Sequence, residues 1–316
     1  MTTDAHGVAD RRDDVGTGGA IGSPWRVVLV SMLAGVAMAI LWSPAFVDTV
    51  IAGGIADPVF GESIRDATIT GSGMAMAFAF MTGFAGMFTA CNVAVFSALA
   101  PMSARTSTVR RQVAGMLRPI GWLLLGAVVV SGLYGVIGVL FADSLPQLSE
   151  GSIGGVPARL LQASIVFGLI GLVMLWRGLA YAGVTPNPFA AISVRHPRAE
   201  IVFLGGLIGA FLIGRPFPPF RNLFAYAAET RDPLLGFVTF ALQSIGNVLG
   251  VVLLFVLLTV LTRGGFQRWL HARPGRHARF AAGAFLLVGA FLVVYWGVKL
   301  GHWADLFGWP RLPYQE

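Results

Sequence analysis

The chain of 316 residues is 56% hydrophobic and 12% charged, with a mean hydropathy of +0.75, which excludes an ordinary soluble domain because such domains are about 25% charged. Its net charge of +7 comes from arginines in short segments between apolar runs, a distribution that membrane topology explains, so we expect no nucleic-acid partner. The single cysteine, Cys91, excludes an intrachain disulfide and a four-cysteine metal site.

Residues 1–25 mix Asp and Arg with Gly, Thr and Ala and predict a disordered cytoplasmic tail. The apolar run that follows predicts an N-terminal transmembrane helix over residues 26–46. A cleaved signal peptide is the alternative, but the polar region before the run is long and no small-residue cleavage pattern follows it.

Six further apolar runs are each long enough to span a bilayer, and none shows the two-residue alternation of an outer-membrane strand. The sequence therefore predicts an all-α polytopic membrane protein with seven transmembrane helices. The six runs cover residues 72–100, 120–141, 160–181, 201–226, 235–261 and 280–300.

Arginine-rich and arginine-poor segments alternate along the chain. Basic segments precede the first predicted helix and connect the second to the third, the fourth to the fifth and the sixth to the seventh, whereas the segments between them are more acidic. Since basic loops stay in the cytoplasm, we expect a multi-pass protein of the inner cell membrane with its N-terminus inside. Residues 301–316 would then form an outer tail.

The second to fourth and the fifth to seventh helices form two sets of three, and an odd number per set makes the second set enter from the opposite side. This is the arrangement of a 3+3 inverted repeat. Both sets begin with an interrupted helix. In the first, residues 83–88 lead into a polar patch with Thr89 and Asn92; in the second, residues 214–222 place three prolines and two arginines where a continuous helix is expected.

Over residues 70–300 the sequence resembles the transmembrane proteins of cytochrome c biogenesis and thiol reductant transfer, of the CcdA and DsbD type. Residues 88–91, Phe-Thr-Ala-Cys, match the family's first Pro-Cys site with alanine in place of proline, and Pro216-Phe217 stands where the second Pro-Cys would be. The resemblance implies that a thiol at the break carries reducing equivalents. Since the second cysteine is absent, Cys91 would exchange with a thioredoxin-like protein, another membrane protein or a second copy.

Three functions follow from these residues. The first is thiol-redox transfer or cytochrome c maturation with Cys91 as the catalytic, oxidoreductase-like thiol, although a lone buried cysteine is also typical of inert packing. The second is a small-solute or ion transporter with a cavity at the paired breaks, where Arg215 favours an anion. The third is a non-catalytic membrane assembly subunit.

The residues expected to line the site share a polar character or a place at a break. For Arg215 the alternative is that its helix ends early and the side chain reaches the outer interface; for Gln243 and Asn247 it is hydrogen bonding between helices. The predicted lining residues are Thr89, Asn92, Arg215, Pro216, Phe217, Asn222, Gln243 and Asn247.

The remaining features predict packing rather than chemistry. Glycines at 83, 86, 205, 206 and 209 are expected to let helices approach closely. The five histidines form no metal pattern, and no phosphate loop, zinc-protease motif or nucleophile elbow is present. We expect no metal or cofactor, and membrane lipid as the surrounding partner.

Overall fold

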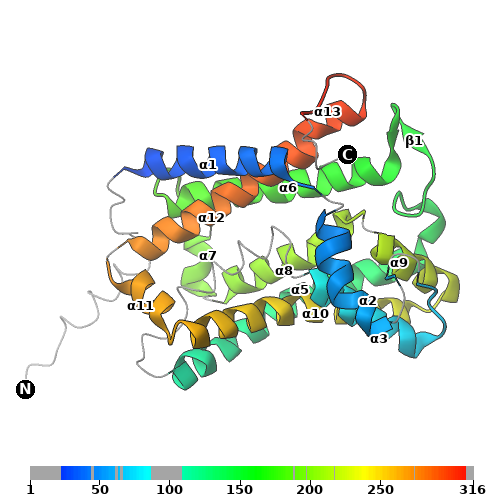
Figure 1. Ribbon diagram of the computed structural model, residues 1–316, viewed down its shortest axis with the longest axis horizontal. Coiled ribbons are helices and arrows are strands. Elements are labelled where there is room, and N and C mark those ends of the chain that lie inside the picture. Colours follow the sequence, from blue (N-terminus) through cyan, green and yellow to red (C-terminus); the bar gives the residue numbers. More distant parts are fainter. Residues whose placement is uncertain are drawn as a thin grey trace, which may run out of the picture.

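Long helices lie side by side through most of the described chain (Figure 1). The runs of Leu, Val, Ala and Phe form helices because a helix satisfies the backbone hydrogen bonds within the segment itself. The computed structural model describes residues 23–43, 46–60, 63–64, 67–86, 109–187, 189–196, 198–216, 218–273 and 275–310. Its helices are α1 Pro24–Leu41, η1 Phe46–Gly53, α2 Gly54–Phe60, α3 Ser72–Ala85, α5 Val109–Leu140, η4 Ala142–Ser144, α6 Ala158–Tyr181, α7 Ala190–Arg195, α8 Ala199–Gly214, α9 Pro218–Thr230, α10 Pro233–Leu261, α11 Gly265–His271, α12 Arg276–Leu292, η5 Val293–Val298 and α13 Lys299–Trp303.

Five helices of the described ranges are long and apolar enough to cross a membrane: α1, α5 from Arg118, α6, α10, and the continuous stretch Arg276–Trp303. The pair α8 and α9, bent by 87° at a short break, makes a sixth if it counts as one span. α3 is apolar but has only 14 residues, and the rest of the predicted helix 72–100 lies outside the described residues. The structure thus confirms an α-helical fold with several helices of membrane-span length.

The boundaries at the two termini differ slightly from the predicted ones. α1 begins at Pro24, within the segment expected to be a disordered tail, and residues 1–22 lie outside the described part. The last helix continues through a π-helical turn and α13 to Trp303, so the expected outer tail starts with helix, and residues 311–316 lie outside the described part.

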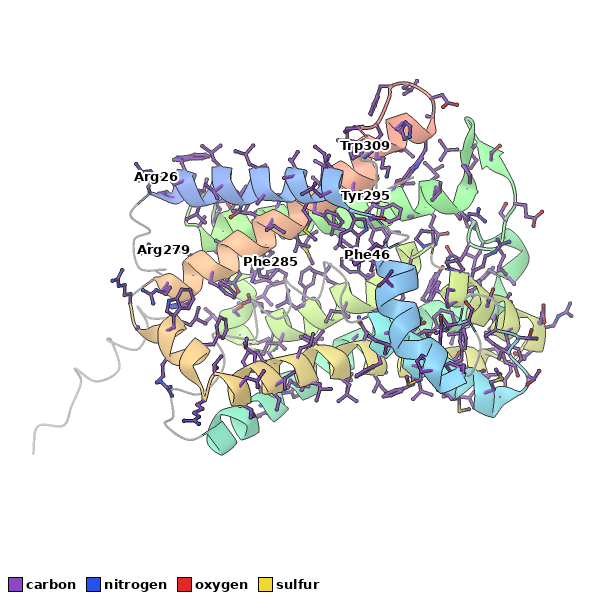
Figure 2. The ribbon with its side chains drawn as sticks, viewed as in Figure 1. Arg26, Phe46, Arg279, Phe285, Tyr295 and Trp309 are labelled. Carbon is purple, nitrogen blue, oxygen red and sulfur yellow. The ribbon has the colours of Figure 1, made fainter. Side chains whose placement is uncertain are left out.

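The helices share two common ends. At the α11 end lie α7, α11 and the first residues of α1, α5, α8 and α12, with Arg26 and Arg279 at this end in Figure 2. At the opposite end, the β1 end, a short antiparallel hairpin pairs β1 Ser152–Ile153 with β2 Val156–Pro157. The described parts of the four basic segments therefore border one end.

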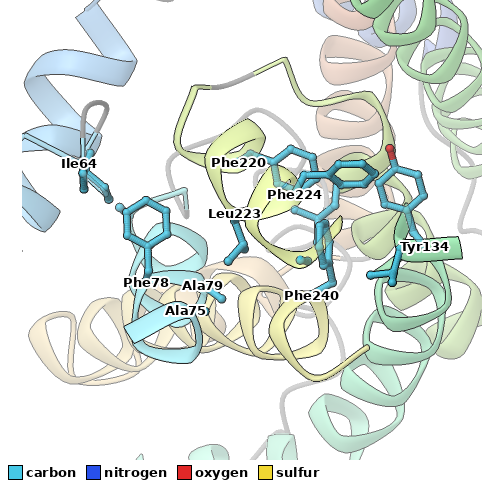
Figure 3. Close-up of a cluster of buried hydrophobic side chains, with 14 residues drawn as sticks. Ile64, Ala75, Phe78, Ala79, Tyr134, Phe220, Leu223, Phe224 and Phe240 are labelled. Atoms are coloured by element: carbon cyan, nitrogen blue, oxygen red, sulfur yellow. The ribbon is translucent and has the colours of Figure 1, made fainter. Parts of the chain in front are cut away.

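Neighbouring helices pack in the order α1, α12, α6, α8, α5, α10 and α3, and α9 contacts α3, α5 and α10. Aromatic side chains fill the space beneath α9. Phe220 and Phe224 of α9 both contact Phe240 of α10, and Phe224 also contacts Tyr134 of α5; Phe78 of α3 lies in the same buried cluster (Figure 3). The apolar face of the amphipathic α9 thus packs on the aromatic side chains of α5 and α10.

Glycines bring α3 and α10 into backbone contact. A Cβ atom added at Gly83 would collide with the carbonyl oxygen of Gln243, and one added at Gly246 would collide with the carbonyl oxygen of Phe80. Only residues without a side chain allow this approach, as small residues commonly do between membrane helices.

The same contact occurs a second time between α8 and α5. A Cβ at Gly205 would collide with the carbonyl oxygen of Leu123, and one at Gly126 would collide with that of Val202. In both pairs the two contacting residues of each helix are three positions apart. The prediction that the glycines serve close helix packing is therefore confirmed for Gly83, Gly205 and Gly209, whereas Gly86 meets only the Arg215 side chain and Gly206 makes an ordinary contact.

Candidate functional site

The break between α8 and α9 follows from its prolines. Proline lacks a backbone donor and disfavours helix in the residue before it, so α8 ends at Gly214 and Arg215 adopts an extended backbone with φ −80° and ψ 108°. Pro218 then starts α9, a position that suits proline. Pro216 lies in the break, and Phe217 lies outside the described residues.

Two glutamine side chains bond the carbonyl groups that the break leaves without helical partners. Gln162 of α6 donates from Nε2 to the carbonyl oxygen of Ile213 at 2.7 Å and contacts the Tyr134 hydroxyl at 3.2 Å. Gln147, which is 2% exposed, donates to the carbonyl oxygen of Arg215 at 2.8 Å. These bonds stabilise the interrupted end of α8, since a buried carbonyl without a partner is costly.

The Arg215 side chain reaches the C-terminal end of α3. Its Nη1 atom would lie 2.6 Å from a Cβ added at Gly86, the residue that caps the C-terminal end of α3. A cation is favoured at this end because the helix dipole leaves partial negative charge there. Residues 83–86 of the first predicted break thus lie beside the second break, with the half-buried Arg215 between them, while residues 87–92 lie outside the described residues.

Gln243 of α10 lies one helical turn away from this junction. It is fully buried and donates from Nε2 to the Thr82 hydroxyl of α3 at 3.3 Å, so the interhelical hydrogen bond considered for it is present. Its Oε1 atom and the Ser244 hydroxyl are buried with no hydrogen-bond partner among the described residues. Asn247 is also buried, at 4% exposure.

The structure brings some of the predicted lining residues together and leaves others untested. Arg215 and Pro216 lie at the junction, Gln243 and Asn247 share the buried face of α10 beside α3, and Asn222 lies on α9 just beyond the break. The predicted thiol and its neighbours, Thr89, Cys91 and Asn92, lie outside the described residues, as does Phe217.

A second buried polar group lies at the α11 end, and sequence reasoning treated its arginine only as part of a basic segment. Arg177 is 2% exposed and forms an ion pair with Glu200, a hydrogen bond of 2.9 Å to Asn187 and one of 3.2 Å to the Tyr181 hydroxyl. The ring of Phe189 lies 5.0 Å from its guanidinium carbon. This group links the end of α6 to the start of α8; the position of Arg177 within an apolar helix was the signal for it.

The arrangement at the junction offers a fixed cation and buried amide and hydroxyl groups, which suit an anion or a thiolate better than a metal ion. Across the described residues, no three His, Cys, Asp or Glu side chains come together as a metal site. Compared with models of protein families, with curated proteins and with solved structures, the chain matches none of them.

Proposed function

We propose that the chain is a multi-pass membrane protein of seven transmembrane helices, in which α1 precedes two three-helix sets in inverted repeat. The sets begin with α3 and with α8. The support is the repeated glycine contact: the first helix of each set meets the second helix of the other with the same spacing of residues. The third helices, α6 and α12, pack on each other with Gly171 against Gly289. Such mutual pairing is expected of two sets related by a pseudo-two-fold axis.

The membrane would be the inner cell membrane, with the α11 end in the cytoplasm. The basis is the gathering of arginine-rich segments at that end, since cytoplasmic loops carry the excess of arginine and lysine. The hairpin and the break of α8 then lie toward the outer side.

We infer that the junction of the two interrupted helices serves thiol–disulfide exchange of the CcdA and DsbD kind, with Cys91 as nucleophile. The observation that carries the inference is the contact of the Arg215 guanidinium with Gly86, five residues before Cys91. A guanidinium near this segment attracts the negative charge of a thiolate, the form of cysteine that attacks disulfides.

The exchange requires a partner that supplies the other thiols. The Cys91 thiolate attacks a disulfide of the partner, which forms a mixed disulfide and releases one partner thiolate. One thiolate of a dithiol in a second, thioredoxin-like or membrane partner then attacks the first partner's sulfur in the mixed disulfide, which releases Cys91 as thiolate and joins the two partners. The other thiolate of that dithiol attacks the disulfide between the partners and releases the first partner as a dithiol, so two electrons pass from the second partner's dithiol to the first partner's disulfide.

The test is to trap this mixed disulfide in native membranes by acid quenching, alkylation with a mass tag and non-reducing electrophoresis. We expect a higher-mass species that is absent in Cys91→Ser and reduced in Arg215→Gln. Arg221→Gln, six residues away on α9, is the matched control and should keep the species. A thiol that stays reduced and unpaired in the wild type would contradict thiol exchange.

A second candidate is transport of a small solute or anion across the same junction. It is favoured by the buried Gln243 Oε1 and Ser244 hydroxyl, which have no partner among the described residues, beside a cationic Arg215. Anion flux into proteoliposomes that survives Cys91→Ser and is lost in Arg215→Gln would favour transport. Full function in both variants would instead favour the non-catalytic assembly role.

A further inference from the structure

The segment between α10 and α12, residues 262–279, carries five arginines and no acidic residue; we call it the arginine loop. Within the described residues, none of these arginines forms an ion pair with a carboxylate. Like charges this close repel one another, so an anion from outside would stabilise the loop. The five are Arg263, Arg268, Arg273, Arg276 and Arg279.

The packing of α11 determines which face of the arginine loop is exposed. Leu270 is fully buried, and Phe266 packs edge to face on Phe280 of α12 at 5.7 Å, so one side of α11 is anchored between α10 and α12. The other side presents Trp269, which is 51% exposed. An exposed tryptophan beside arginines is typical of the interface between bilayer and water.

Backbone carbonyl groups hold two of the guanidinium groups in place. Arg268 donates from Nη1 to the carbonyl oxygen of Arg263 at 2.8 Å, and Arg276 donates from Nη1 to that of Trp269 at 2.6 Å. The guanidinium carbon of Arg276 also lies 4.7 Å from the centre of the Trp269 ring. Each of these guanidinium groups has further N–H groups for an anion, because arginine carries five donors.

Apolar surface continues directly from the arginine loop along α10. Leu257, Val260 and Leu261 are at least half exposed on the last turn of this span-length helix. A ligand with an anionic head and an apolar tail would therefore cover both surfaces at once, which neither a free phosphate nor a nucleic acid would do.

We propose that the arginine loop binds the headgroup of an anionic phospholipid at the membrane surface. The phosphate lies among the arginines beside Trp269, and the acyl chains lie along the exposed face of α10. This site depends on the proposed placement in a membrane but not on Cys91 or Arg215, so thiol exchange and lipid binding are tested independently.

The test compares lipid binding to the purified full-length chain in a neutral detergent. Native mass spectrometry titrates phosphatidylglycerol and, separately, phosphatidylcholine of the same acyl chains. The variant Arg268→Gln, Arg273→Gln, Arg279→Gln removes three exposed charges. The matched control, Arg159→Gln, Arg221→Gln, Arg231→Gln, removes three charges at the β1 end. Since each arginine near an anionic lipid surface contributes roughly fivefold in affinity, we expect the first variant to bind phosphatidylglycerol on the order of 100-fold more weakly.

The control variant should bind phosphatidylglycerol as the wild type does, and phosphatidylcholine should bind weakly to all three proteins. Should the triple variant fail to fold, Arg273→Gln alone is expected to lower the affinity roughly fivefold. Equal affinity for the two lipids, or an unchanged affinity in both arginine-loop variants, would overturn the proposal. Binding that appears only after deletion of residues 1–22, which contain four aspartates, would show that this acidic segment occupies the loop instead.

Discussion

Arg177 and Arg215 lie near opposite ends of α8 and meet different surroundings. Arg177 is 2% exposed and its charge is matched by the Glu200 carboxylate, and it also donates hydrogen bonds to Tyr181 and Asn187. Arg215 is half-buried; its guanidinium lies against Gly86 at the end of α3, and its backbone carbonyl accepts a hydrogen bond from the Gln147 side-chain amide. A buried arginine with a dedicated carboxylate is a structural link, whereas Arg215 lies beside the partial negative charge at the end of α3 and is partly open to solvent.

The largest expected effect comes from removing the ion pair of Arg177. Glu200→Ala leaves the buried guanidinium without its counter-charge, and we expect a loss of about 3 kcal/mol in the free energy of unfolding, toward the low end for a broken buried pair because the Glu200 side chain is 24% exposed. Titration of the purified protein with SDS in mixed micelles measures it. Glu229→Ala, at an exposed site, is the control, and equal losses in both variants would refute a dedicated ion pair.

Substitutions of Gly83 and Gly86, two glycines near the junction, are expected to affect stability and thiol exchange differently. Gly83→Ala forces a Cβ into the Gln243 carbonyl, which cannot move without its helix, and should lower the free energy of unfolding by about 2 kcal/mol. Gly86→Ala meets only the flexible end of Arg215, so we expect a loss below about 1 kcal/mol but a weaker Cys91-dependent mixed disulfide. The same SDS titration and the trapping experiment measure these outcomes. The reverse order of stabilities would contradict the described contact.

Gln147→Ala tests how the break in α8 is stabilised. The substitution leaves the buried Arg215 carbonyl oxygen without its donor, and we expect a cost of about 1–2 kcal/mol in the free energy of unfolding. Gln147→Glu has nearly the same shape but cannot donate when ionised, so it should not restore stability. Ser149→Ala, two residues further along the chain at an exposed position, serves as the control.

The smallest expected effect comes from removing the Tyr181 hydroxyl beside the Arg177–Glu200 ion pair. Tyr181→Phe removes the hydroxyl that donates to Glu200 at 2.9 Å and contacts Arg177 at 3.2 Å, while it keeps the ring. Because the ion pair remains, we expect a loss of only about 1 kcal/mol, measured by the shift in thermal unfolding of the detergent-solubilised protein. A loss as large as that of Glu200→Ala would assign the main role to the hydroxyl.

The positions of the apolar runs predicted where most of the span-length helices lie. α6 and α10 begin and end within two residues of the predicted runs, whereas α1 ends five residues before the predicted end; long apolar stretches have few alternatives to helix in a membrane. The interruption at residues 215–217 was also predictable, because proline breaks a helix by local chemistry alone.

Long-range partners were not predictable in the same way. Gln147 and Gln162 bond carbonyl groups more than fifty residues away, and Glu200 lies 23 positions from Arg177. The local sequence around these residues does not predict their partners, because a long-range hydrogen bond forms only between helices that become neighbours in the folded protein.

By itself, the amino-acid sequence determined the α-helical class of the fold, the positions of most of its apolar helices, the break after Gly214 and the gathering of arginines in alternate segments. These properties depend on composition and on neighbours a few positions apart. The tertiary structure alone decided that Arg215 reaches Gly86, that α3 meets α10 as α8 meets α5, and that Arg177 has Glu200 as its partner. Such contacts arise only when distant helices pack, and packing depends on the shapes of whole surfaces rather than on any local stretch of residues.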